Sequence, residues 1–152
     1  MTNRTRFCSA LRWALFALLL GASGLAQAQT FYTARTVLAL FFPSSQRVTY
    51  RRFELNAELR GKLAQRLGVP VAKEAYTFYY ALTGDKLDGY ALIDEAMGKY
   101  MPITYAIKFS PQGSVQQVEI MVYRENYGSE VTDARFRKQF VGKTTADPLL
   151  LD

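Results

Sequence analysis

The chain has 152 residues, of which 49% are apolar and 14% aromatic, which suffices for one compact domain and is too short for two. The formal net charge of +6 falls to +3 when the three arginines before residue 13 are set aside, leaving 16 basic against 13 acidic residues. Because such a domain lacks a dense basic stripe, no nucleic-acid partner is expected. The sequence has no His, which excludes Ser-His-Asp and Cys-His catalysis and imidazole metal sites.

The first 28 residues have the pattern of a secretory signal peptide. Basic residues precede a short apolar run at 14–20, and small residues then lead to Ala26-Gln27-Ala28. We expect cleavage before Gln29 and export to the bacterial periplasm, with an uncleaved anchor as the alternative. The only cysteine, Cys8, lies in this segment, so residues 29–152 are expected to have no disulfide, no thiolate nucleophile and no Cys-ligated metal or cluster.

Two helices are expected in the first half of the mature chain. Residues 36–42 are apolar and stop at Pro43, which indicates a short helix that ends in a turn. A second, amphipathic helix is expected over residues 57–67, because Asn56 is a good N-cap and leucines recur at every fourth position. Residues 48–55 alternate only loosely and are interpreted as an extended approach to this helix.

From residue 75 onward, aromatic and β-branched residues separated by turn signals predict an antiparallel meander. The four strands are expected over residues 76–82, 87–94, 103–109 and 115–123. Residues 110–113, Ser-Pro-Gln-Gly, suit a type I turn, which makes the last two strands a hairpin.

The end of the chain completes an α+β fold in this interpretation. In the fourth strand, Gln117, Glu119 and Met121 share one face, which is expected to be the wetter one. Thr132 is expected to cap a last helix that ends at Gly142. The expected fold class is therefore α+β, with an antiparallel sheet of about four strands and flanking helices in one domain.

Catalytic candidates are few. The carboxylate pairs Asp94-Glu95 and Asp85 with Asp88 are interpreted as solvated surface acids, so no catalytic residue is assigned and no hydrolase is supported. The densest polar segment, residues 124–130, directly follows a strand end, where functional loops are common. The alternative is a plain strand-to-helix connection in which Gly128 supplies a positive φ.

An ordered series of short motifs runs from the second predicted strand to the last helix. The motifs are Gly89-Tyr90, Asp94-Glu95, Gly98-Lys99, Pro102-Ile103-Thr104, Pro111-Gln112-Gly113, Val118-Glu119, Tyr123-Arg124-Glu125, Gly128, Glu130-Val131, Phe136, Gln139-Phe140 and Gly142-Lys143. In order and spacing they resemble the FMN-binding domain, which is shared by the periplasmic subunits of sodium-pumping quinone reductase and the Rnf complex and by many small exported flavoproteins. The resemblance covers residues 87–143.

The resemblance implies an electron carrier whose FMN phosphate is esterified to a threonine by a separate flavin transferase. The residues that it implies for cofactor binding are Gly98, Lys99, Pro102, Arg124, Glu125, Gly128 and Glu130. Among the cations, Lys99, Arg124 and Lys143 are expected near the phosphate or the electron-rich reduced ring. The implied partners are FMN and a membrane or periplasmic redox protein, with membrane association only through that partner or through an uncleaved signal.

The sequence departs from this family at the attachment motif. Ser-Gly-Ala-Thr does not occur between Met1 and Asp152, and Thr144 and Thr145 lack the Gly-Ala before them. Covalent attachment is therefore not expected, and residues 29–152 are interpreted as an incomplete FMN-binding-like domain. The chain is then a truncated form of a longer carrier, a weak flavin binder or a protein without flavin. A cofactor-free periplasmic interaction module is the alternative function.

Overall fold

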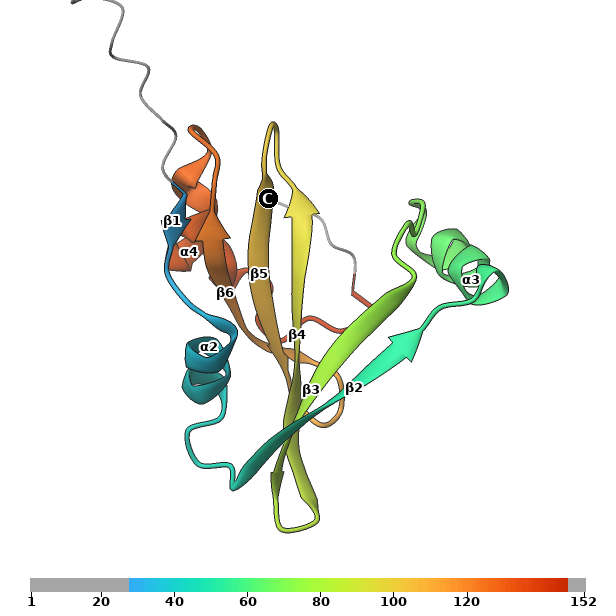
Figure 1. Ribbon diagram of the computed structural model, residues 1–152, viewed down its shortest axis with the longest axis vertical. Coiled ribbons are helices and arrows are strands. Elements are labelled where there is room, and N and C mark those ends of the chain that lie inside the picture. The colour runs from blue at the N-terminus through green and yellow to red at the C-terminus, as the bar shows by residue number, and fades with distance from the viewer. Residues whose placement is uncertain (1–27, 148–152) are drawn as a thin grey trace, which may run out of the picture.

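The computed structural model describes residues 28–147 as one antiparallel sheet with three short α-helices and a 3₁₀ turn (Figure 1). The strands are β1 (Gln29–Thr30), β2 (Arg47–Glu54), β3 (Ala75–Thr83), β4 (Lys86–Met97), β5 (Pro102–Phe109) and β6 (Val115–Tyr123). The helices are α2 (Ala34–Phe41), α3 (Ala57–Leu67), the 3₁₀ turn η1 (Ser129–Thr132) and α4 (Ala134–Lys138). Across the sheet the strand order is β1-β6-β5-β4-β3-β2.

The expected α+β fold with about four strands is wrong. Six strands hold 40% of the described residues and the helices 23%, so the sheet dominates the structure. The additional strands are β1 and β2. Residues 47–54 form a strand because each of them pairs with a residue of β3, from Arg47 opposite Leu82 to Glu54 opposite Ala75. Pairing with a neighbouring strand thus determines the conformation of this segment, in which apolar and polar residues alternate only weakly.

The predicted meander itself is confirmed as β3 to β6. The bounds of β6 are those expected, and β4 extends three residues further than expected, to Met97. The β5–β6 hairpin closes with the Gly113 N–H donating to the Ser110 carbonyl at 3.0 Å. Hairpin connections alone therefore order the four strands.

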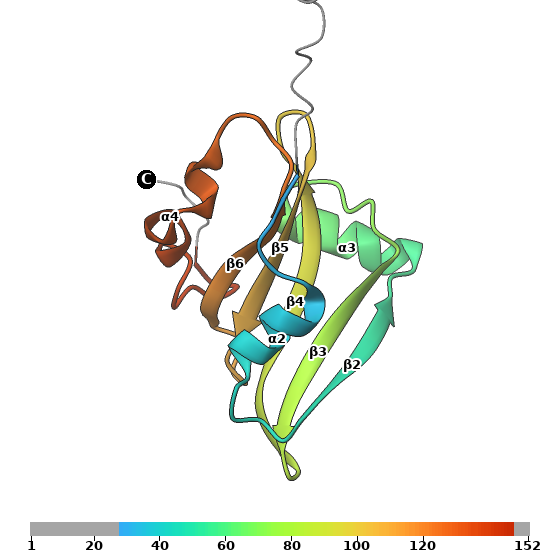
Figure 2. The ribbon, with the colours of Figure 1, turned by 60° about the vertical axis from the view of Figure 1, so that its left-hand side comes forward.

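Helix α2 lies across one face of the sheet, and the core lies between this helix and the strands (Figures 1 and 2). It begins two residues earlier than expected because Thr33 and Thr36 form a reciprocal capping box. Its Val37 and Phe41 side chains are fully buried. They pack on a row of small residues from three adjacent strands, Ala81, Ala91 and Ala106, each with no exposed surface. Alanine at these positions lets the helix approach the sheet closely.

The expectation that the Gln117, Glu119 and Met121 face of β6 is wet is wrong. Met121 is 4% exposed because it belongs to the core under α2, and Glu119 is 8% exposed. The Glu119 carboxylate is covered by Arg137, whose guanidinium lies 3.1 Å from it. The face that was expected to be wet is therefore covered at Met121 by the core under α2 and at Glu119 by Arg137 of α4.

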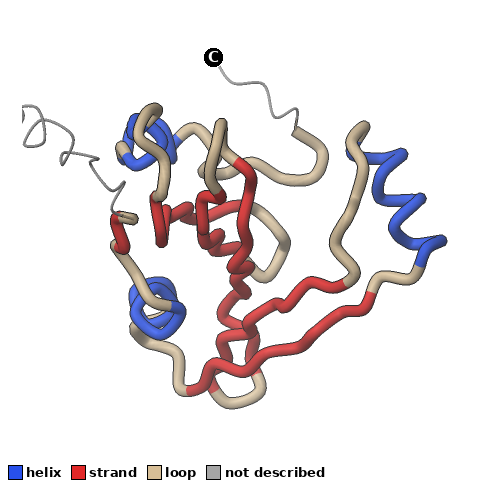
Figure 3. Tube along the Cα trace, turned by 45° about the horizontal axis from the view of Figure 1, so that its top comes forward, coloured by secondary structure: helices blue, strands red, loops and turns tan. Residues whose placement is uncertain are grey.

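Helix α3 has the expected bounds but does not pack in the core. Its N-cap is Asn56, whose side chain accepts the Leu59 N–H at 2.8 Å, and it ends at Gly68 with φ +70°. None of its residues is buried, and Leu67 is 59% exposed. Figure 3 shows the two long strands that lead to α3 running away from the rest of the sheet, which carries the helix away from α2.

The single last helix expected between Thr132 and Gly142 is wrong. The segment is divided into η1 and α4, and Asp133 is the N-cap of α4, with its side chain accepting the Arg135 N–H at 2.7 Å. Helix α4 is held on β6 by Arg137, whose Nε donates to the Val118 carbonyl at 2.9 Å. Asp133 replaces Thr132 as the cap because the chain first completes the 3₁₀ turn.

The expected signal peptide lies outside the described residues, apart from Ala28. Between residues 28 and 147, the helices are too short and too polar to cross a membrane.

Candidate functional site

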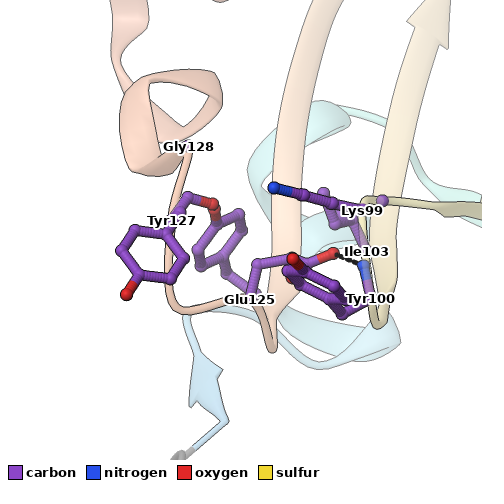
Figure 4. Close-up of a pocket in the computed structure, with 8 residues that line it drawn as sticks. Lys99, Tyr100, Ile103, Glu125, Tyr127 and Gly128 are labelled. Atoms are coloured by element: carbon purple, nitrogen blue, oxygen red, sulfur yellow. Dashed lines mark hydrogen bonds between the residues drawn. The ribbon is translucent and has the colours of Figure 1, made fainter.

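A small open pocket lies where the β4–β5 turn meets the segment that follows β6 (Figure 4). Its volume is about 280 Å³. It is lined by Gly98, Lys99, Tyr100, Ile103, Tyr123, Glu125, Tyr127 and Gly128. Four of the seven predicted cofactor-binding residues are among them, whereas Pro102, Arg124 and Glu130 are not.

Glu125 holds the β4–β5 turn closed. Its Oε1 atom accepts the N–H of Tyr100 at 2.6 Å and that of Met101 at 2.9 Å. The Met101 and Tyr100 hydrogen bonds hold the pKa of the Glu125 carboxyl below its ordinary value, and the nearby Lys99 charge acts in the same direction. This oxygen is therefore directed into the turn.

Gly98 makes room for that carboxylate. A Cβ atom at Gly98 would lie 2.5 Å from the Glu125 Oε1 and 3.0 Å from the Met101 carbonyl oxygen. The Gly98 N–H also donates to that carbonyl at 3.0 Å. Gly98 and Glu125, which were both predicted to bind the cofactor, thus contact each other and close one turn.

Arg124 and Pro102 are joined beside the pocket. The Arg124 Nη1 donates to the Pro102 carbonyl at 2.9 Å and to the Thr104 hydroxyl at 3.0 Å, and it lies 3.7 Å from the Glu95 Oε1. The Thr104 hydroxyl in turn donates to Glu95 at 2.8 Å. Arg124 therefore fixes the start of β5 to the end of β6.

Gly128 shapes the opposite wall. Its φ of +81° confirms the expected positive value, and the Tyr123 hydroxyl donates to the carbonyl of Tyr127 next to it. Burial raises the pKa of Tyr123, and the charges of Glu125 and Glu130 raise it further. Glu130 itself lies in η1, where its carboxylate acts on Tyr123 from a distance.

Three side chains of the pocket, those of Lys99, Tyr100 and Tyr127, could contact a ligand. The Lys99 Nζ lies 5.0 Å from the centre of the Tyr100 ring. Tyr100 is 64% exposed and Tyr127 is 78% exposed, and Figure 4 shows their rings on two sides of the pocket. An ammonium group with two exposed aromatic rings suits a planar ligand that carries negative charge.

Sequence reasoning did not assign the tyrosines of the pocket. Tyr127 stands directly before Gly128, and Tyr100 directly after Lys99, so both occupy turns next to residues that were assigned. Each is an aromatic residue in a polar turn, where it cannot join the core, and this pattern could have identified both tyrosines as candidate ligand contacts.

Lys143 is not brought to the pocket. Its carbonyl accepts the N–H of Val115, the first residue of β6, whereas the pocket lies at the other end of that strand. Nearby, the Thr144 hydroxyl donates to the Asp147 carboxylate at 2.8 Å. Lys143 and Thr144 therefore belong to a separate part of the surface.

Sheet topology and pocket together define a β-rich domain with a shallow, tyrosine-lined site at one end of its central hairpin. Within residues 28–147, acidic, Cys or His side chains do not gather in a group that would hold a metal ion. In comparisons with known proteins, no family model matches the chain and no curated protein matches it.

Proposed function

We propose that the chain is an exported FMN-binding-domain protein that passes electrons between membrane or periplasmic redox partners. In this proposal FMN is held without a covalent bond at the pocket between the β4–β5 turn and the β6 exit. One observation carries the proposal: two motifs that are distant in the sequence, Gly98-Lys99 and the segment from Glu125 to Gly128, line one pocket together with exposed aromatic rings.

The residues of the pocket fit one end of such a cofactor. Tyr100 and Tyr127 offer apolar ring faces for stacking, and Lys99 offers an ammonium group for a phosphate or an electron-rich ring. When bound, the flavin supplies the redox chemistry. The pocket volume of about 280 Å³ lies just below the range of small-molecule sites, roughly 300–1,000 Å³. We therefore expect weak binding, with much of the cofactor exposed.

The remaining polar residues act by positioning. Glu125 holds the turn that presents Lys99 and Tyr100, since it accepts the N–H of Tyr100. The Tyr123 hydroxyl holds the carbonyl of Tyr127 and thereby the opposite wall. These two contacts hold the backbone on the two sides of the pocket.

Titration of the protein with FMN and with riboflavin, followed by flavin fluorescence, tests the proposal. Both compounds should bind, because both carry the flavin ring. Lys99→Ala should weaken the binding of FMN, which has a phosphate group, about tenfold, and should leave the binding of riboflavin, which has none, unchanged. Lys86→Ala is the matched control, since Lys86 is exposed at the β3–β4 turn. Equal weakening of FMN binding in both variants would contradict a role for Lys99.

The aromatic contribution is tested separately. Tyr127→Ala should weaken the binding of FMN and of riboflavin alike, because stacking involves the ring that they share. Tyr50→Ala, on β2, is the control with a similarly exposed ring, 71% against 78%. Absence of binding in the unmodified protein would reject the flavin proposal.

Covalent attachment is expected to be absent when the chain is produced together with FMN and a flavin transferase. The Thr144 hydroxyl donates to Asp147, and neither Thr144 nor Thr145 has the small residues of the attachment motif before it. Fluorescence in a denaturing gel and the intact mass give the answer. A mass increase of one FMN that survives denaturation would contradict this expectation.

A cofactor-free periplasmic interaction module is the second candidate. It is favoured by the contacts of three predicted site residues. Gly98, Arg124 and Glu125 all make contacts within the protein that hold the β4–β5 turn and the start of β5 in place. A colourless protein that does not respond to FMN or riboflavin would favour this candidate.

Export is the remaining part of the proposal. N-terminal sequencing of the periplasmic protein should give Gln29 as the first residue, because Ala26-Gln27-Ala28 is a typical cleavage site. A cytoplasmic chain that still begins at Met1 would contradict it.

A further inference from the structure

Strand β2 presents a free edge of the sheet. It is the last strand in the order and pairs only with β3, over all eight of its residues and with unbroken register. Figures 1 and 2 show the outer side of β2 open along its length. Each of its residues, from Arg47 to Glu54, is exposed. Its backbone N–H and C=O groups on the outer side are thus available to another strand.

The two edges of the sheet differ. At the opposite edge, β1 pairs with β6 over only two residues, and a very short edge strand is a common protection against unwanted pairing. β2 contains no proline and no bulge, and its apolar side chains Val48, Tyr50 and Phe53 are between 38% and 71% exposed. The charged side chains of β2 are therefore the main feature that selects which strand can pair with it.

The charge on this edge is mostly positive. Strand β2 contains three arginines, Arg47, Arg51 and Arg52, and one acidic residue, Glu54. The Glu54 carboxylate is already paired with the Arg52 Nε at 2.6 Å. Arg51 lies over the Phe53 ring at 5.8 Å. Among the described residues, neither Arg47 nor Arg51 forms an ion pair. A partner strand can therefore bring two carboxylates to them.

A second copy of the chain does not provide these carboxylates. Two copies related by a two-fold axis would pair β2 with β2 antiparallel, and residues on the same face would meet. If the two-fold axis passes beside Arg51, the Arg51 side chains of the two copies lie opposite each other. If it passes beside Tyr50, Arg51 lies opposite Thr49 of the other copy, and Arg52 lies opposite Val48. Neither register brings Glu54 to an arginine, so self-pairing is disfavoured.

We propose that β2 is a docking edge for an extended acidic segment of another protein, which adds to the sheet as a further strand. Arg47, Thr49, Arg51 and Phe53 lie on one face of β2, and Val48, Tyr50, Arg52 and Glu54 on the other. A segment in which acidic and apolar residues alternate places its carboxylates beside Arg47 and Arg51 and its apolar residues beside Val48 and Tyr50. Main-chain hydrogen bonds provide affinity and the side chains provide selectivity.

Labelled synthetic peptides test this proposal by fluorescence anisotropy with the full chain. The first peptide alternates Glu and Val over seven residues, the second replaces Glu by Lys, and the third replaces each Val by Pro at unchanged charge. The Glu-Val peptide should bind, and added salt should weaken its binding. The Lys peptide should not bind. The proline peptide should bind at least tenfold more weakly, because each Pro lacks an N–H donor and fixes φ at about −65°, which disfavours the extended strand conformation.

Matched variants place the binding on β2. The double variant Arg47→Gln/Arg51→Gln should weaken binding of the Glu-Val peptide at least tenfold, whereas Arg66→Gln, an exposed arginine of α3, should leave it unchanged. Hydrogen exchange of the β2 amides should slow when the peptide is bound. Both arginines are exposed, so the double variant should retain the melting temperature of the unmodified chain.

Three results would overturn the proposal. The first is equal binding of the proline and Glu-Val peptides, which would show attraction between charges without strand pairing. The second is an equal loss of binding in the Arg66 variant. The third is a dimer in sedimentation that Arg51→Gln abolishes, which would make a second copy the occupant of this edge.

Discussion

Gly98 is the position at which one added carbon matters most for the pocket. Gly98→Ala places a Cβ atom 2.5 Å from the Glu125 Oε1, so the carboxylate must leave the N–H groups of Tyr100 and Met101. We expect a loss of about 1–3 kcal/mol in the free energy of unfolding, measured with urea. Gly61→Ala on α3 is the control. It has free space around its Cβ and should gain about 0.5–1 kcal/mol.

A double variant tests whether the Glu125 carboxylate causes the loss of stability in Gly98→Ala. In a Glu125→Ala background, Gly98→Ala should cost clearly less, because the displaced carboxylate is already absent. Strict additivity of the two changes would contradict the close contact between Gly98 and Glu125.

Glu125 also predicts a specific pH dependence. Because its pKa is lowered in the folded chain, its stabilising contribution is complete above the ordinary value of 4.5 and is lost as the pH falls through the lower folded value. The difference in melting temperature between the unmodified chain and Glu125→Gln should be constant from pH 6 to 8 and should narrow below pH 4.5. A difference that grows on acidification would have the wrong sign.

For single residues, the sequence predicts which residues lie at the pocket better than it predicts the contacts that they make. Gly98 and Glu125 belong to the predicted site and do lie together, yet their contact with each other closes a turn. Spacing along a chain does not show the direction of a side chain. Tyr127 was not assigned because an exposed aromatic residue has no periodic pattern to identify it.

Among the elements, α4 depends on one partly buried ion pair. The Arg137 and Glu119 side chains are 18% and 11% exposed, and their charged atoms lie 3.1 Å apart. Arg137→Met should cost about 3 kcal/mol in the free energy of unfolding, because it removes the ionic partner of Glu119 and the hydrogen bond to the Val118 carbonyl. Arg135→Met should change it by less than about 0.5 kcal/mol, since the Arg135 side chain is 90% exposed. Equal effects in the two variants would show that α4 is not held by this pair.

Local signals predicted elements that carry their own caps and turns. Helix α3 has Asn56 and Gly68 at its ends, and its bounds were predicted without error. Strand β2 has no such signals, because its conformation depends on the β3 neighbour that pairs with it. The split between η1 and α4 was missed because Thr132 and Asp133 are both good caps and only the packing of the chain selects one of them.

For the whole molecule, stability depends on the contact between α2 and the sheet. Phe41 is fully buried, and Phe41→Ala should lower the free energy of unfolding by about 3–5 kcal/mol. Leu67→Ala, at the exposed end of α3, should change it by less than about 0.5 kcal/mol although it also removes a large apolar side chain. Urea unfolding of both variants measures this contrast. A large loss from Leu67→Ala would show that α3 belongs to the core.

The number of strands was the main error in the predicted fold, and its cause is non-local. The meander from β3 to β6 follows from turn signals between neighbouring strands, whereas β1 consists of two residues that no pattern identifies. Its pairing of Gln29 with Tyr123 joins parts of the chain that are far apart in sequence. Only the folded sheet shows that the start of the described chain belongs beside its last strand.

The position of α2 has a consequence for the order of folding. The strands β3 to β6 are joined by hairpins and can form early, since their contacts are local. Phe41 and Met121 belong to one core cluster, which can be completed only after most of the chain has been synthesised, because Met121 lies near the end of β6. Until this cluster forms, Ala81, Ala91 and Ala106 remain exposed to water. Variants of Phe41 should therefore mainly accelerate unfolding, and variants within the β5–β6 hairpin should mainly slow folding.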